Sequence, residues 1–194
     1  MLNVDFLTKS WRYRIKNASL HKEFIAKAIG ISKTLNPHII DATAGLGRDS
    51  FILASLGYQV TLIERSLIVF EALKNALQIA AEDQQFRETV SRMHLIHGDA
   101  LDYLQTTTAD IIYLDPMFPT KIKSAAVKKE ILQLQHLLGE DKDAVALLKL
   151  SLSCATIRVV VKRPRLSDPL GQLSPSFSYE GKSNRFDIYL IHPK

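Results

Sequence analysis

The chain has 194 residues, 46% apolar and 23% charged, which excludes disordered and fibrous classes and predicts one domain with a sizeable core. Its apolar runs are too short to span a bilayer, and the start MLNVDFLTKS lacks the basic and apolar regions of a signal peptide. We therefore expect a cytoplasmic protein without a membrane partner. The single cysteine excludes an internal disulfide, and the net charge of +5 favours a polyanionic partner.

The predicted elements begin with an amino-terminal segment, residues 1–36, that holds a basic leader and one amphipathic helix near residues 20–35. We expect this segment to pack on a single core domain, residues 37–194. In the core, short apolar stretches alternate with longer stretches of helical periodicity, an order typical of parallel strands joined by crossover helices. Strands are expected at 38–43, 59–64, 94–99, 110–115 and 157–162, and helices at 48–56, 67–82, 124–138 and 143–154.

The chain ends differently, in two apolar stretches, 177–180 and 186–191, joined by the short sequence Gly-Lys-Ser-Asn. Such a short connection favours an antiparallel hairpin over a crossover helix. The predicted fold is therefore α/β, with a mostly parallel seven-stranded sheet, a C-terminal antiparallel hairpin and helices on both faces.

A glycine loop follows the first predicted strand, in the sequence DATAGLGRDS. Asp41 ends the strand, Gly45 and Gly47 follow, and a helix is expected to start at Arg48. Glycines let the backbone turn tightly and approach a ligand, and free amides at a helix start favour a negative group. The spacing matches neither the three-glycine dinucleotide fingerprint nor a phosphate loop. By itself, the pair is also compatible with a tight turn that binds nothing.

Acids at the next two strand ends favour a ligand with a nucleoside. Glu64 lies about twenty residues beyond the glycine loop, where an acid accepts the hydroxyl hydrogens of a ribose. Asp99, in His-Gly-Asp-Ala, is placed to accept from an adenine amino group. Either acid alone is compatible with a helix cap or a solvated turn. Together with Asp41, they put three acids in register at the carboxyl edge of the sheet.

The fourth predicted strand ends in Asp115-Pro116-Met117-Phe118-Pro119. Two prolines make this turn rigid and hold an aromatic ring beside an acid. The turn suits a flat, amine-bearing ring, because the Asp115 carboxylate or the Pro116 carbonyl accepts from the amine while Phe118 stacks. The alternative is an apolar loop plug without a ligand.

The order D-x-x-x-G-x-G, E, G-D-A, D-P-M-F resembles the Rossmann-like class I S-adenosylmethionine-dependent methyltransferases, although Met117 replaces the usual second proline. Six blocks, DATAGLGRD, LIER, YLDPMFP, KSAAVKKE, VVVKRP and RFDIY, resemble the bacterial family that methylates the exocyclic N2 amine of a guanine in 16S ribosomal RNA. Members of that family often carry an additional segment before the core, whereas this sequence begins almost at the core.

The resemblance implies S-adenosyl-L-methionine as cofactor, S-adenosyl-L-homocysteine as product, and 16S rRNA or the assembled 30S subunit as partner. With the glycine loop, the expected cofactor contacts are Asp41, Gly45, Arg48, Asp49, Glu64, Arg65, Asp99, Ala100 and Asp115. Arg48 is placed to pair with the methionine carboxylate. Asp115, Pro116 and Phe118 are the expected catalytic residues. No metal is expected, and the sequence does not predict the oligomeric state.

Basic residues next to the motif are expected to contact RNA phosphates. They are Lys121, Lys123, Lys162 and Arg163. The proline motif alone also permits a methyltransferase acting on DNA adenine or on a protein amide. A nucleic-acid-binding module without catalysis is disfavoured by the acids at strand ends, and an NAD-dependent oxidoreductase by the missing third glycine.

Overall fold

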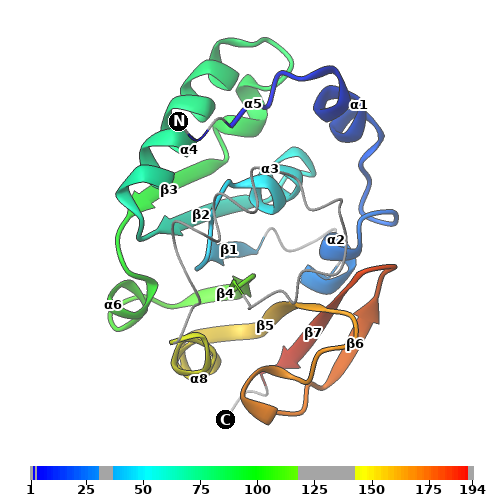
Figure 1. Cartoon of the computed structure of the whole chain (residues 1–194), viewed down its shortest axis with the longest axis vertical. Coiled ribbons are helices and arrows are strands. Elements are labelled where there is room, and N and C mark those ends of the chain that lie inside the picture. Colours follow the sequence, from blue (N-terminus) through cyan, green and yellow to red (C-terminus); the bar gives the residue numbers. More distant parts are fainter. Residues whose placement is uncertain (1, 3, 31–36, 118–142, 192–194) are drawn as a thin grey trace.

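The computed structural model describes residues 2, 4–30, 37–117 and 143–191. A seven-stranded sheet with the order β3-β2-β1-β4-β5-β7-β6 runs through the molecule (Figure 1). Strands β1 to β5 pair in parallel, and β7 pairs antiparallel with both β5 and β6. The prediction of a mostly parallel sheet with a C-terminal antiparallel hairpin is confirmed. The strands are β1 His38–Asp41, β2 Gln59–Glu64, β3 Met93–His97, β4 Ala109–Leu114, β5 Ala155–Pro164, β6 Phe177–Glu180 and β7 Asn184–Leu190.

Helices connect the parallel strands and also form the amino-terminal segment. They are α1 Lys9–Asn17, α2 Phe24–Ile29, α3 Arg48–Ser55, α4 Leu67–Glu82, α5 Arg87–Val90, α6 Ala100–Leu104, α8 Ala144–Cys154 and the 3-10 turn η1 Leu170–Gln172. Of the predicted helices, the one at 124–138 and the end of the one at 20–35 lie outside the described residues. Three further helices, α1, α5 and α6, were not predicted, because they are short or strongly polar and carry little apolar periodicity.

Helices cover both faces of the sheet, as predicted. One core cluster joins α2, α3 and α4 to one face, where Ile39, Leu62 and Ile111 point. A second cluster joins α6 and α8 to the other face, where Ile40 and Ile112 point. Neighbouring residues of one strand therefore enter different cores, as expected when both faces of a parallel sheet are buried. In the described part of the chain, no helix is long and apolar enough to cross a membrane.

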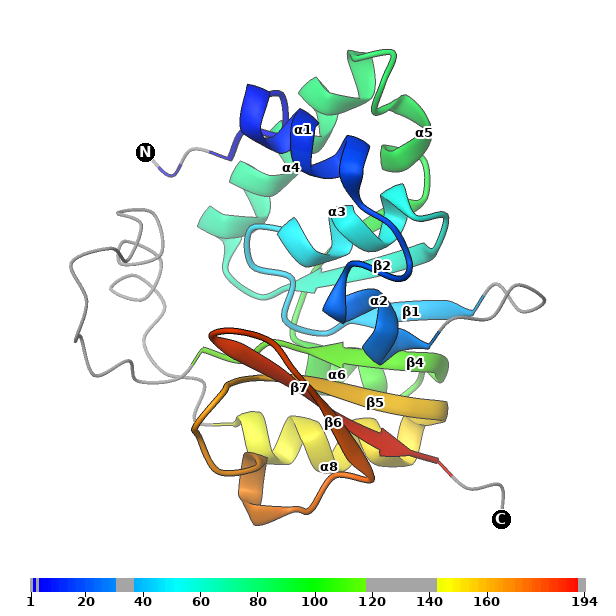
Figure 2. The ribbon, with the colours of Figure 1, turned by 90° about the vertical axis from the view of Figure 1, so that its right-hand side faces the viewer.

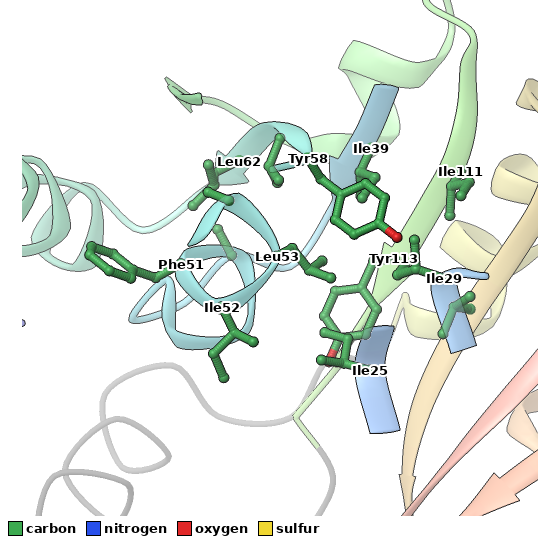
Figure 3. Close-up of a cluster of buried hydrophobic side chains, with 14 of the residues drawn as sticks. Ile25, Ile29, Ile39, Phe51, Ile52, Leu53, Tyr58, Leu62, Ile111 and Tyr113 are labelled. Carbon is green, nitrogen blue, oxygen red and sulfur yellow. The ribbon is translucent and has the colours of Figure 1, made fainter. Parts of the chain in front are cut away.

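The amino-terminal segment packs on the α3 face. Phe6 is buried and stacks on Phe51 of α3, with ring centroids 4.3 Å apart. Helix α2 buries Ile25 and Ile29, which lie close to Tyr113 of β4 in Figure 3. Helix α2 also contacts β6 and β7, as seen in Figure 2. The expected boundary between residues 36 and 37 adjoins residues outside the described ranges and stays a prediction.

Candidate cofactor and catalytic site

A cavity of about 660 Å³ opens at the carboxyl ends of the parallel strands. Its walls come from the residues that follow β1, β2, β3 and β4, from the end of β5, and from α2 and the β6–β7 turn. Open α/β sheets bind their ligands at this edge, because a crevice forms where the loops after adjacent strands leave toward opposite faces of the sheet. The volume lies within the usual range for small-molecule sites.

The glycine loop depends on backbone conformations that suit glycine. Gly45 has a φ of +53° and Gly47, the N-cap of α3, a φ of +67°, both in the left-handed region. A Cβ on Gly47 would lie 2.7 Å from Leu73 Cδ1, so this glycine also lets α4 pack close. Among the described residues, a Cβ on Gly45 would meet only the Thr43 carbonyl, at 3.8 Å, which leaves space for a ligand.

Asp41 is buried at the root of the loop, with 2% of its surface exposed. Ser50 Oγ donates to one carboxyl oxygen, and the Thr43 amide donates to the other at 3.2 Å. Burial raises the pKa of this carboxyl to about 7, although both hydrogen bonds oppose the shift. Asp41 lines the cavity, and its bonds tie the end of β1 to the start of α3. It therefore shapes the loop that was expected to hold the cofactor.

Glu64 and Asp99 stand at the ends of β2 and β3, and both line the cavity. Glu64 accepts from the Gly45 amide at 2.9 Å and from the Ser66 amide at 2.7 Å. Glu64 thus joins the glycine loop to the turn before α4, and it stands where an acid accepts ribose hydroxyls. Asp99 is the N-cap of α6 and accepts from the Leu101 amide at 2.8 Å. It both caps a helix and lines the cavity.

A network of charged groups occupies the middle of the site. Lys162 Nζ donates to Asp49 Oδ2 at 2.7 Å and to Asp115 Oδ2 at 2.8 Å. Tyr113 Oη donates to the same Asp49 oxygen at 2.6 Å. Burial opposes ionisation of Asp49, but the Lys162 ammonium and these hydrogen bonds hold its pKa below the ordinary value. The Asp115 amide also donates to Thr43 Oγ1 at 2.6 Å, so the proline motif is joined to the glycine loop.

The sequence predicted Lys162 and Arg163 as RNA contacts, and both line the cavity. Lys162 is 21% exposed and lies between the two carboxylates. Arg163 is 8% exposed, and its guanidinium donates to the Asp168 carbonyl at 2.7 and 3.1 Å. Both belong to β5, an inner strand between β4 and β7, and these bonds hold their side chains in the cavity wall. Their assignment as RNA contacts stays a prediction.

The other predicted residues are placed as follows. Arg48, Ala100 and Pro116 line the cavity. Arg65 also lines it and pairs with Asp143, just before α8, at 2.7 Å. Phe118, Lys121 and Lys123 lie outside the described residues.

The site also contains residues that the sequence did not single out, from the amino-terminal segment and from the β6–β7 turn: Arg14, Glu23, Phe24, Lys182, Ser183 and Asn184. These segments lie far apart in the chain, and no local pattern signals that they meet.

A mostly parallel seven-stranded sheet with an antiparallel end, and a glycine loop and acids at its carboxyl edge, define the class of Rossmann-like methyltransferases. A family model described as "Putative SAM-dependent methyltransferase" matches residues 1–191. The chain belongs to this family and is an enzyme that uses S-adenosylmethionine. The fold class, enzyme class and cofactor predicted from the sequence are confirmed.

Relatives and a solved structure resemble the chain over most of its length. The Ribosomal RNA small subunit methyltransferase J of Thioalkalivibrio sulfidiphilus (strain HL-EbGR7) is 46% identical over 193 residues, covering 97% of this chain and 76% of that protein. The protein of the same name from Aeromonas salmonicida (strain A449) is 49% identical over 191 residues, covering 97% and 77%. A crystal structure of a SAM-dependent methyltransferase from Neisseria gonorrhoeae superposes with a TM-score of 0.77 at 38% identity, covering 99% of this chain and 75% of that one. The predicted family resemblance is confirmed.

Proposed function

We propose that this protein transfers a methyl group from S-adenosylmethionine to the exocyclic N2 amine of a guanosine in 16S ribosomal RNA. The observation that carries the proposal is the cavity in which Gly45, Glu64 and Asp99 adjoin Asp115 and Pro116. In this cavity, the residues expected to bind the cofactor lie beside the motif expected to bind the target amine. The printed names of the relatives, ribosomal RNA small subunit methyltransferases, support this substrate.

The residues of the carboxyl edge fit the cofactor. The space beside Gly45 admits a ligand close to the backbone, and Glu64 lines the cavity at the end of β2, where an acid accepts ribose hydroxyls. We assign the adenosine part to Glu64, Asp99 and Ala100, and the amino-acid part to the loop with Arg48. Asp41 and Asp49 hold this loop and the start of α3 in shape. When bound, S-adenosylmethionine supplies an electrophilic methyl group on a sulfonium sulfur.

Asp115 and Pro116 act on the other reactant. A guanine amine is a weak nucleophile, because its lone pair is delocalised into the ring. The Asp115 carboxylate and the Pro116 carbonyl accept the N2 hydrogens, which holds the amine in line for attack and draws its lone pair out of conjugation. Lys162 holds Asp115 in place through the 2.8 Å bond. Once N2 is bonded to the methyl carbon, Asp115 or water accepts the proton that N2 loses.

The amine lies on the edge of a base, so the target nucleotide must be unpaired or turned out of its helix. Both naked rRNA and the assembled 30S subunit offer such sites. The first experiment is therefore methyl transfer from labelled S-adenosylmethionine to both substrates, prepared from cells that lack the enzyme, followed by nucleoside analysis. We expect the label in N2-methylguanosine.

The same assay tests the other acceptors of this class of enzyme. Duplex DNA with adenine sites and a ribosomal protein fraction are offered in parallel, with the same enzyme preparation. Label in N6-methyladenine or in a protein amide, with none in rRNA, would contradict the proposal and leave the methyltransferase class intact. A preference for one rRNA form would identify the stage of subunit assembly at which the enzyme acts.

A further inference from the structure

Part of the cavity wall comes from neither the cofactor residues nor the proline motif. It consists of Arg14, Glu23 and Phe24 of the amino-terminal segment and of the β6–β7 turn at 181–184. Strand pairing explains the position of the turn, because Pro164 at the end of β5 lies opposite Asn184 at the start of β7. The turn therefore stands at the same sheet edge as the cofactor residues. We name this part of the cavity the hairpin arm.

The hairpin arm lies at a distance from the cofactor end. The sheet order places β2 and β7 four strand steps apart, through β1, β4 and β5, or about 19 Å at the usual spacing of neighbouring strands. Glu64 ends β2 and Asp115 follows β4, so the cofactor groups occupy the β3–β4 half of the sheet edge. The hairpin arm begins where the reacting amine is expected, and it offers room for the rest of the acceptor.

An exposed aromatic ring stands in this arm. Phe24, the first residue of α2, is 40% exposed although α2 otherwise buries its apolar residues. Its ring edge meets the turn, where a Cβ on Gly181 would lie 3.8 Å from Phe24 Cδ2. Lys27 Nζ lies 5.2 Å from the ring centroid, over one face. The ring is thus contacted at its edge and on one face, and its 40% exposure leaves part of it accessible to a flat ligand.

Basic residues line the same cavity as the Phe24 ring. Arg14, which is about half exposed, lies 3.6 Å from the Glu23 carboxylate, and both line the cavity. Lys182 is exposed at the tip of the turn. An aromatic ring that shares a cavity with Arg14 and Lys182 suits a nucleobase with phosphates on either side, since bases stack on aromatic rings and phosphates pair with basic groups.

Resting on the proposed function, we infer that the hairpin arm is the acceptor-nucleotide subsite, in which Phe24 stacks on the target guanine and Arg14 and Lys182 contact its flanking phosphates. The amino-terminal segment is then part of the substrate site as well as of the core. Phe24 acts by positioning the base, and Asp115 remains the group that touches the reacting amine.

The decisive experiment compares Phe24→Leu with Phe177→Leu. Phe177 is the matched control, because it is 39% exposed, belongs to β6 and lies outside the cavity lining. We expect Phe24→Leu to lower kcat/KM for rRNA by roughly 5- to 150-fold, the range for stacking one base on an aromatic ring. The Kd for S-adenosylmethionine should stay within twofold of wild type for both variants. Phe24→Tyr should restore most of the rate.

A second pair of variants tests the subsite without any change in α2, so its result does not depend on how α2 folds. Lys182→Ala, on the exposed turn, should reduce the slope of log Kd for rRNA against log salt by about 0.7–0.9, the value for one lost phosphate contact. Lys149→Ala on the outer side of α8 is the control, and its slope should equal that of wild type. Equal kcat/KM for the two leucine variants, or equal slopes for the two alanine variants, would overturn the subsite. A wild-type enzyme that does not methylate rRNA would instead overturn the proposed function.

Discussion

At the scale of single residues, Asp115 is the group on which the proposed chemistry depends. Replacing it by Asn keeps the shape and removes the carboxylate that accepts the N2 proton. We expect Asp115→Asn to lower kcat by about 10²-fold or more, the usual contribution of a positioned acid or base. Single-turnover methyl transfer, with calorimetric binding of S-adenosylmethionine and rRNA, measures this. Full activity with both affinities intact would contradict a carboxylate role and leave the Pro116 carbonyl as the acceptor.

Replacing Lys162 tests whether the network of Lys162, Asp49 and Asp115 stabilises the fold as one unit. Its ammonium lies between the Asp49 and Asp115 carboxylates, so Lys162→Met leaves two partly buried acids without their common counter-ion. We expect the free energy of unfolding at pH 7 to fall by about 2–3 kcal/mol, below the full cost of breaking a buried pair because Lys162 retains some exposure.

Urea unfolding measures the loss, and Lys149→Met on α8 is the control. Adding Asp49→Asn to Lys162→Met should recover part of the stability, because one of the two uncompensated charges is then removed. Additive losses in the double variant would show that the two residues are independent.

At the scale of elements, the amino-terminal segment is held to the core by an aromatic cluster. Phe6 stacks on Phe51, and Trp11 of α1 lies 5.6 Å from Phe6. We expect Phe6→Ala to lower the free energy of unfolding by about 3 kcal/mol, the low end for an aromatic residue deleted from a core. Tyr13→Ala, within α1 but at a position 73% exposed, should change it by less than about 0.5 kcal/mol. Equal effects of the two variants would mean that the segment does not pack as described.

The elements also show how far the sequence predicts this fold. Strand β2 and helix α4 match their predicted bounds because apolar periodicity decides which of their residues are buried. Strand β6 also matches, and its four residues are bounded by turn residues on the side of β7. Helix α1 was predicted only as a basic leader, because its polar sequence KSWRYRIKN forms a helix by capping and by packing through Trp11. Short elements of this kind are stabilised by distant partners that a local pattern does not contain.

The site was predictable to a similar degree. The glycine loop and the acids after β1, β2, β3 and β4 were found from the sequence, because each marks the carboxyl end of a strand and the sheet brings those ends together. The sequence predicted neither the bridging role of Lys162 nor the presence of Arg14, Phe24 and Lys182 in the cavity wall. They follow from β5 lying beside β4, and from α2 packing on the β6–β7 hairpin.

At the scale of the whole molecule, the buried Asp41 makes stability depend on pH. Its pKa is about 7 in the folded protein, against 3.8 for an ordinary carboxyl, so folding takes up a proton between about pH 4 and 7. The unfolded chain binds fewer protons in this window, and the free energy of unfolding therefore falls as pH rises. The cost of ionising Asp41 is absent near pH 4 and complete above pH 7. A shift of this size corresponds to at most about 4 kcal/mol.

Asp41→Asn removes this dependence and keeps the hydrogen bonds, because an amide accepts from Thr43 and donates to Ser50 Oγ. We expect the stability of Asp41→Asn relative to wild type to rise steadily from pH 4.5 to 7.5 in urea unfolding. Asn75→Gln, an exposed change on α4 without a titratable group, should differ from wild type by a constant amount. A constant difference for Asp41→Asn as well would show that Asp41 is ionised throughout this range in the folded protein. The loop would then be held by a charged carboxylate whose burial is offset by Ser50, Thr43 and the ligand.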